Sequence, residues 1–196
     1  MAFRHSDDPT PGGVAQVAPI PVKMVVAGGF GVGKTTFVGS ISEITPLRTE
    51  AAMTSLSVGI DDIGDASTKT TTTVAMDFGR LTLGDDLILY LFGTPGQDRF
   101  QFMWEDLVRG AIGAVIMVDT SRLGDCFPAI DFMEQRGAPF LVAINAFNGE
   151  VGHTIEDVRE ALTLSPDIPI VIIDARDRAA TRDTLLHLVQ HAIART

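Results

Sequence analysis

Residues 28–35, with the sequence GGFGVGKT, have the residue types and the spacing of a phosphate-binding loop. They satisfy the pattern G-x-x-x-x-G-K-[ST], in which glycines allow backbone N–H groups to turn towards phosphate oxygens at the start of a helix. Lys34 would add a point charge, and the Thr35 hydroxyl would bind Mg²⁺, which prefers hard oxygen ligands. The residues expected to contact the nucleotide phosphates are Gly28, Gly29, Phe30, Gly31, Val32, Gly33, Lys34, Thr35 and Thr36.

The segments around this loop alternate between strand-like and helix-like patterns. Strands are predicted at 22–27, 72–83, 87–92, 114–119, 140–145 and 170–174, and helices at 34–42, 125–135, 155–162 and 181–194. The strands at 72–83 and 87–92 are expected to form a hairpin, whereas residues 44–71 lack a sustained period and are interpreted as a long functional loop. Alternation of this kind predicts a three-layer α/β domain with a mostly parallel, six-stranded sheet, one antiparallel edge strand and about five helices.

Length and composition limit the classes of protein that this chain could be. Its 196 residues fit one domain, expected over 21–196 after a Pro- and Gly-rich flexible tail at 1–20. The formal net charge of −10 argues against nucleic acid as a partner, and no apolar stretch is long enough to cross a bilayer. The single cysteine, Cys126, is expected to be a buried apolar residue, in agreement with a cytoplasmic protein that partners could recruit to a membrane.

A second motif narrows the class of phosphate-binding protein. Residues 89–100, LYLFGTPGQDRF, resemble the strand-to-switch segment of Ras-like GTPases, ordinarily written D-T-A-G-Q-E-R-F. The resemblance implies that the Gly96 N–H senses the γ-phosphate and that Gln97 orients the attacking water. It also places the switch threonine that reaches Mg²⁺ within residues 70–73, where the register is ambiguous and Thr73 is favoured. The implied catalytic residues are therefore Lys34, Thr73 and Gln97, and the implied metal ligands are Thr35 and Thr73.

Two further segments occupy the positions where this family recognises the base. Residues 145–148, NAFN, stand where the family carries N-K-x-D, and residues 174–176, DAR, stand at its S-A-K position. The nucleotide-binding residues implied there are Asn145, Phe147, Asn148, Asp174, Ala175 and Arg176. Asn148 replaces an aspartate that accepts two hydrogen bonds from guanine, so the preference for guanine is expected to be weakened, and XTP or ATP becomes an alternative ligand. Phe147 could stack on the base or pack in the core.

Within the superfamily the chain is most similar to bacterial GTPases that work with Roadblock/LC7 proteins. The conservon GTP-binding proteins resemble it most, and the gliding-motility polarity GTPases resemble it more distantly. The resemblance implies a small switch protein that binds GTP or GDP with Mg²⁺, with a Roadblock/LC7-type protein and a sensor-kinase-like protein as partners.

Two departures from the family pattern affect metal binding and hydrolysis. Gly93 replaces the aspartate that holds a Mg²⁺ water, and Asp61, Asp62 or Asp119 could substitute for it. Phe30 stands where a small residue leaves room for an arginine finger, so hydrolysis is expected to be slow unless an arginine such as Arg48 contributes. A nucleotide-binding scaffold with little turnover and an ATP-using P-loop enzyme therefore stay open as alternatives.

Overall fold

The fold was analysed in a computed structural model, which describes residues 18–54, 71–84, 86–96, 98–149 and 151–195. The strands are β1 (Ile20–Gly28), β2 (Leu47–Thr54), β3 (Thr71–Leu83), β4 (Leu87–Gly93), β5 (Ala111–Val118), β6 (Phe140–Asn145) and β7 (Ile170–Ile173). The α-helices are α1 (Lys34–Ile41), α2 (Trp104–Val108), α3 (Phe127–Gln135), α4 (Ile155–Ala161) and α5 (Arg178–Ala194). Three 3₁₀ segments join them: η1 (Asp98–Met103), η2 (Thr120–Cys126) and η3 (Phe147–Gly149).

All seven strands belong to one sheet, in the order β2-β3-β4-β1-β5-β6-β7. The strands β4, β1, β5, β6 and β7 are parallel, and β3 runs antiparallel to both of its neighbours. The predicted α/β class, the mostly parallel sheet, the single antiparallel strand and the five helices are confirmed. β3 is not at the edge, however, because β2 covers it and raises the number of strands to seven.

β2 corrects the interpretation of residues 44–71 as one long loop. Residues 47–54 pair one for one with residues 78–71 of β3. Backbone pairing forms such a strand without any hydrophobic period in its sequence, which is why pattern analysis missed it. The rest of the expected loop, residues 55–70, and most of the expected N-terminal tail, residues 1–17, lie outside the described residues.

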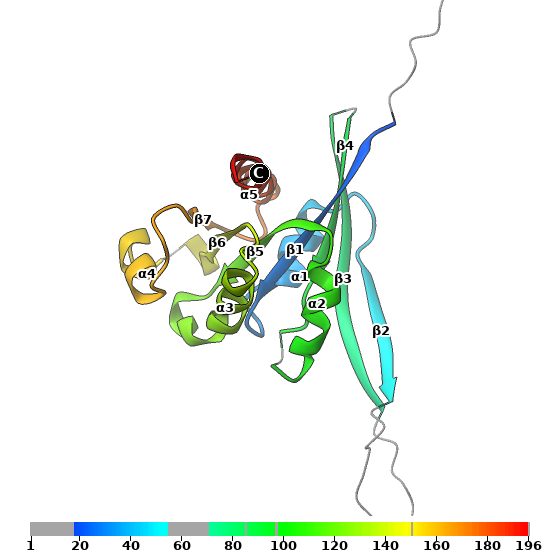
Figure 1. Cartoon of the computed structure of the whole chain (residues 1–196), viewed down its shortest axis with the longest axis horizontal. Coiled ribbons are helices and arrows are strands. Elements are labelled where there is room, and N and C mark those ends of the chain that lie inside the picture. Colours follow the sequence, from blue (N-terminus) through cyan, green and yellow to red (C-terminus); the bar gives the residue numbers. More distant parts are fainter. Residues whose placement is uncertain (1–17, 55–70, 85, 97, 150, 196) are drawn as a thin grey trace, which may run out of the picture.

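Helices cover both faces of the sheet (Figure 1). Met24 and Val26 of β1 pack in one cluster with α1 and α5, whereas Val25 and Ala27 pack in a second cluster with α2, α3 and α4. A strand buried on both faces reads as an unbroken apolar run, which explains why β1 could be predicted. No helix in the described ranges is long and apolar enough to cross a membrane.

Cys126 and Trp104 both lie in the second cluster. Cys126 is only 2 % exposed, which confirms the prediction of a buried cysteine. Trp104 opens α2 and is also buried, with its ring edge-on to Phe132 of α3 at 5.5 Å between centroids. Its role is therefore to pack α2 against the rest of the domain.

The sheet places the carboxyl ends of β1, β4, β5, β6 and β7 along one edge. The glycine loop follows β1, residues 94–96 follow β4, Asn145 ends β6, and Asp174 follows β7. In open parallel sheets the crevice outside these strand ends is where ligands bind. The predicted motifs therefore converge although they are far apart in the sequence.

Candidate nucleotide-binding site

The glycine loop connects β1 to α1 through a backbone that other residues would not tolerate. Gly33, the residue before α1, has φ of 105°, in the region that favours glycine. A Cβ atom added to Gly33 would lie 2.6 Å from Nδ2 of Asn145. Glycine is therefore required at Gly33 both by the turn and by the neighbouring β6 end.

A cavity of about 420 Å³ opens over this loop and the start of α1. It is lined by Phe30, Gly31, Gly33, Lys34, Thr35, Thr36, Asp77, Thr94, Pro95 and Gly96. The structure thus gathers most of the predicted phosphate-contacting residues with Gly96 from the second motif. We refer to this cavity as the phosphate pocket.

Gly96 closes the phosphate pocket from the side of β4. A Cβ atom added to Gly96 would lie 2.7 Å from Nζ of Lys34 and 2.9 Å from Cα of Phe30. The absence of a side chain allows the two motifs to touch, and it brings the Gly96 backbone to the lysine that the resemblance assigns to the phosphates.

Lys34 lies at the floor of the pocket and is only 8 % exposed. Its ammonium donates to the carbonyl oxygens of Gly28 at 2.8 Å and Gly29 at 2.6 Å. An ammonium has three N–H groups, so one remains for a ligand. Burial lowers the pKa of Lys34 from 10.5 to about 8, and the nearby Asp77 carboxylate offsets part of this effect.

Asp77 is a site residue that sequence analysis missed. Its Oδ2 atom accepts a hydrogen bond from the Thr35 hydroxyl at 2.6 Å. Across the β3–β4 ladder Asp77 pairs with Gly93, and a Cβ atom on Gly93 would lie only 3.1 Å from the Cβ of Asp77. A carboxylate from the next strand therefore lies beside the position where Gly93 has no side chain. The signal was present in the hairpin, because counting outward from the pair Leu83–Leu87 places Asp77 opposite Gly93.

Asn145 braces the glycine loop from the end of β6. Its Nδ2 atom donates to the Val32 carbonyl at 2.9 Å, and its Oδ1 atom accepts from the Ala175 N–H at 3.1 Å. Both ends of the amide are thus used within the protein. Asn145 ties the phosphate pocket to the loop after β7.

A second cavity, of about 170 Å³, lies beside the first and is lined by Gly33, Thr36, Asn145, Phe147, Asp174, Ala175 and Arg176. We refer to it as the base-side pocket. Phe147 is 46 % exposed, so it is not a core residue, and its position on the pocket favours the stacking interpretation. The base-side pocket therefore brings together all the described residues that the resemblance assigned to recognition of the nucleotide base.

Asp174 and Arg176 form a pair at the rim of the base-side pocket. The Asp174 carboxylate accepts from Nη2 of Arg176 at 2.6 Å and from the Arg176 backbone N–H at 2.9 Å. Hydrogen bonds from the Arg176 side chain and backbone lower the pKa of Asp174 to about 2. The rim therefore presents a fixed carboxylate at neutral pH.

Several predicted residues are not placed in either pocket. Gln97 lies outside the described residues, as do Asp61 and Asp62, and the side chains of Asn148 and Arg48 are likewise not described. Arg48 belongs to β2, opposite Asp77. Thr73 lies within β3, four residues from Asp77, so their Cα atoms are about 13 Å apart along the strand.

Asp119 does not supply the missing carboxylate. It accepts hydrogen bonds from the Ser121 N–H at 2.9 Å and the Ser121 hydroxyl at 2.6 Å, and it pairs with Arg122. Asp119 lines a separate, narrow gap behind the glycine loop and not the phosphate pocket. Its position therefore does not favour this alternative from the sequence.

Comparison with known proteins supports the interpretation of this edge of the sheet as a nucleotide-binding site. A family model described as "Conserved hypothetical ATP binding protein" matches residues 26–195. An uncharacterized protein of Methanocaldococcus jannaschii is 35 % identical over 126 residues, which cover 63 % of this chain and 69 % of that protein.

Solved structures with the same fold include GTPase domains. The Arl6 BBS3 small GTPase of Trypanosoma brucei, solved with the nucleotide analogue GppNp, superposes with a TM-score of 0.63 at 18 % identity, over 90 % of this chain and 100 % of that one. The G domain of the T. maritima FeoB iron transporter gives 0.61 at 15 % identity, over 88 % and 99 %. The FeoB G-domain of Methanococcus jannaschii gives 0.58 at 13 %, over 88 % and 98 %. At these identities the likeness shows the fold, which is that of a P-loop GTPase domain.

The depressed pKa of Lys34 predicts that phosphate binding weakens at alkaline pH. A phosphate ligand requires the ammonium form, so affinity should fall by up to about tenfold per pH unit above pH 8, with a proton taken up on binding. The stability of the ligand-free protein should change in the opposite sense. Between about pH 8 and 10.5 the unfolded lysine still holds a proton that folded Lys34 has lost, so the destabilisation caused by burying Lys34 decreases as pH rises.

Titration calorimetry with GDP between about pH 7 and 9, in two buffers of different ionisation enthalpy, measures both the affinity and the proton uptake. Lys23→Met is a suitable control, because Lys23 also has a lowered pKa but lies outside both pockets. An affinity that stays constant over this range would contradict the assignment.

Proposed function

The chain belongs to the family of conserved hypothetical ATP-binding proteins, and from this premise we propose that it is a small GTP-binding switch protein with slow GTP hydrolysis. The observation that carries the proposal is that the two pockets are contiguous, since Gly33 and Thr36 line both. A nucleotide could place its phosphates over Lys34 and its base beside Phe147. The phosphate and base motifs of the sequence would then act on one ligand.

The donor set of the phosphate pocket fits a hard divalent cation. The Thr35 hydroxyl and the Asp77 carboxylate are 2.6 Å apart beside Lys34, and both are oxygen donors of the kind that Mg²⁺ prefers. Thr35 and Asp77 would hold the ion, whose charge would partly neutralise the phosphate groups of the nucleotide. We propose that Asp77 takes over the task of the aspartate that Gly93 replaces, by orienting Thr35 and a water in the shell of the ion.

The surroundings of the γ-phosphate position favour slow hydrolysis. By the resemblance to the Ras-like switch segment, Gln97, the residue after Gly96, would orient the attacking water. No arginine is among the described residues that line the phosphate pocket. The Phe30 ring is 66 % exposed and lines the pocket, where it would hinder an arginine supplied by another protein.

The output of the switch is proposed to be protein binding. Phe30 and Phe102 are both more than half exposed, and Phe102 lies in η1, directly after the segment of Gln97. Exposed aromatic side chains on a nucleotide-responsive segment are suited to contact a partner. By its resemblance to the conservon proteins, the chain would act in the cytoplasm with a Roadblock/LC7-type protein and a sensor-kinase-like protein, which could recruit it to a membrane.

Two other functions are supported by particular residues. Gly93 and Phe30 together would suit a scaffold that holds GTP or GDP without useful turnover. Asn148, together with the family description that names ATP, would suit a protein that binds ATP or XTP.

Nucleotide competition tests the proposed ligand. With Mg²⁺ present, we expect GTP and GDP to bind, XTP to bind within about tenfold of GTP, and ATP to bind at least about tenfold more weakly. The reason is that Asn148 removes one acceptor for guanine without creating contacts for adenine. Displacement of a fluorescent GDP from nucleotide-free protein gives the affinities. Equal competition by ATP would reject the guanine assignment, and Lys34→Ala should abolish binding of all four.

The proposed role of Asp77 predicts a rescue by exchange across the strand pair. Asp77→Gly should reduce the gain in GDP affinity that Mg²⁺ provides by about tenfold to a hundredfold. Loss of a residue in the outer shell of a metal has an effect of this size. Gly93→Asp in the same chain should restore most of that gain, because the new carboxylate enters from the paired position that Asp77 has left. Mg²⁺ titration of GDP dissociation is the measurement.

Asp86→Asn, at the exposed end of the same hairpin, is the matched control and should leave the Mg²⁺ dependence unchanged. Gly93→Asp alone should weaken it, because two carboxylates would crowd one space. A double variant that binds no better than Asp77→Gly would show that Asp77 does not replace the missing aspartate.

Single-turnover hydrolysis separates the switch from the scaffold. We expect GTP bound to the purified protein to decay slowly but measurably, and a Roadblock/LC7-type partner to change that rate. Phe30→Gly should allow faster stimulated turnover, because it removes the ring from the pocket. Bound GTP that never decays, with or without the partner, would support the scaffold instead.

A further inference from the structure

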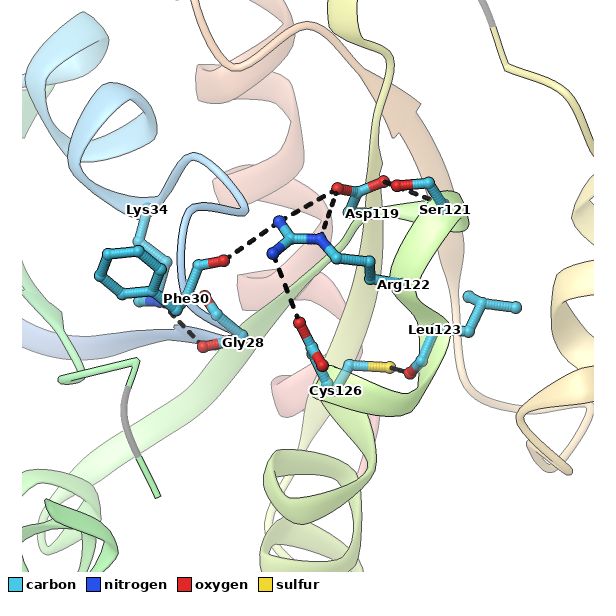
Figure 2. A network of polar contacts seen from close by, with 10 residues as sticks. Gly28, Phe30, Lys34, Asp119, Ser121, Arg122, Leu123 and Cys126 are labelled. Carbon is cyan, nitrogen blue, oxygen red and sulfur yellow. Dashed lines mark hydrogen bonds and ion pairs between the residues drawn. The ribbon is translucent and has the colours of Figure 1, made fainter. Parts of the chain in front are cut away.

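Arg122 reaches from η2 to the backbone of the glycine loop (Figure 2), and it lines the narrow gap beside the loop and not the phosphate pocket. Its Nη2 atom donates to the carbonyl oxygen of Phe30 at 3.1 Å. Sequence analysis assigned nothing to Arg122, and the proposed function does not use it. The contact is nevertheless the one that links η2 to the peptide between Phe30 and Gly31.

Two carboxylates hold the guanidinium in place. Asp119 accepts from Nη2 of Arg122 at 3.3 Å and from Nε at 3.4 Å, while Asp125 lies 3.7 Å from Nη1. Asp119 is itself fixed by the Ser121 N–H and hydroxyl. η2 is also interrupted at Arg122, whose φ of −143° and ψ of 53° are not helical. Arg122 is therefore oriented by its neighbours and is not a freely moving surface side chain.

The space between η2 and the back of the loop is almost closed. The gap lined by Phe30, Asp119, Arg122, Asp125 and neighbouring residues has a volume of about 10 Å³, which leaves room for at most about one water molecule. The carbonyl oxygen of Phe30 accepts its hydrogen bond from Arg122 at this gap.

The geometry of the peptide group connects this contact to the pocket on the other side. No peptide bond among the described residues is cis. In a trans peptide the C=O and the N–H point in opposite directions. Because the Phe30 carbonyl points towards Arg122, the Gly31 N–H points away from η2, and Gly31 lines the phosphate pocket.

We propose that Arg122 is a positioning residue, which fixes the Phe30–Gly31 peptide so that the Gly31 N–H is presented to a phosphate group in the pocket. A hydrogen bond to the carbonyl also polarises the peptide and makes its N–H a better donor. The charge of the guanidinium is balanced by Asp119 and Asp125, so it acts through this directed bond and not by attracting the ligand from a distance. This inference rests on the proposed nucleotide site.

Affinity for GDP and GMP measured on the same variants tests the proposal. Arg122→Ala should weaken GDP binding by about tenfold and GMP binding much less. Tenfold is the low end for loss of a charged hydrogen bond, as expected at a partly exposed site. The difference follows if the Gly31 N–H serves the phosphates beyond the first. Arg122→Lys should restore little, because one ammonium cannot replace a planar fork that bonds Phe30 and both carboxylates.

Arg182→Ala is the matched control. Arg182 has a similar exposure and pairs with the neighbouring Asp183, but its bonds do not reach the loop, so GDP affinity should be unchanged. The amide resonance of Gly31 in ¹⁵N-labelled protein gives an independent readout. It should shift on GDP binding, and the shift should be smaller in Arg122→Ala.

The outcomes separate this inference from the proposed function. If the unmodified protein binds no purine nucleotide, the proposed function fails and the inference fails with it. If the unmodified protein binds GDP while Arg122→Ala loses GDP and GMP affinity equally, or loses neither, only the positioning role is overturned. Should Arg122→Ala fail to fold, Arg122→Gln, which keeps one amide donor, takes its place and should fall between the two in GDP affinity.

Discussion

The candidate site depends on one constraint, which is that the loop between β1 and α1 keeps its carbonyl groups engaged by the protein. The carbonyls of Gly28 and Gly29 accept from Lys34, that of Phe30 accepts from Arg122, and that of Val32 accepts from Asn145. Three side chains from different parts of the chain thus set the direction of neighbouring peptide groups. With the carbonyls held, the intervening N–H groups are left for the pocket, and no reorganisation is needed when an anion arrives.

The sheet supplies the positions from which those braces act. Asn145 is the last residue of β6, and Arg122 follows the end of β5, the strand between β6 and β1, so both stand at the carboxyl edge of the sheet. Both β5 and β6 are buried on two faces, and this burial fixes the register of each strand against its neighbours. The GTPase domains that are 13–18 % identical to this chain share the fold that provides these positions.

The sequence was informative wherever the chemistry is local. We could predict the features that depend on one contiguous segment of sequence each. These are the glycine loop, the buried run of β1, the strand at 140–145 and the alternation of strands and helices. β2 could not be predicted, since its partner is residues 71–78 and its own sequence has no period. Arg122 was missed because nothing local distinguishes it from a surface arginine. Asp77 was missed for a different reason, since its role follows from the residue it faces across a hairpin.

The charge around the phosphate pocket explains why the Asp77 carboxylate matters for binding of the proposed nucleotide. Among the described residues that line the pocket, Lys34 and Asp77 are the only ionisable ones, so the lining carries no net charge. The whole chain has a formal charge of −10, which adds repulsion for a nucleotide polyphosphate. A carboxylate 2.6 Å from the Thr35 hydroxyl would repel a bare phosphate, whereas with a divalent cation between them the same carboxylate becomes attractive. Asp77 would thus make binding conditional on the metal, and the loop amides alone would not be sufficient.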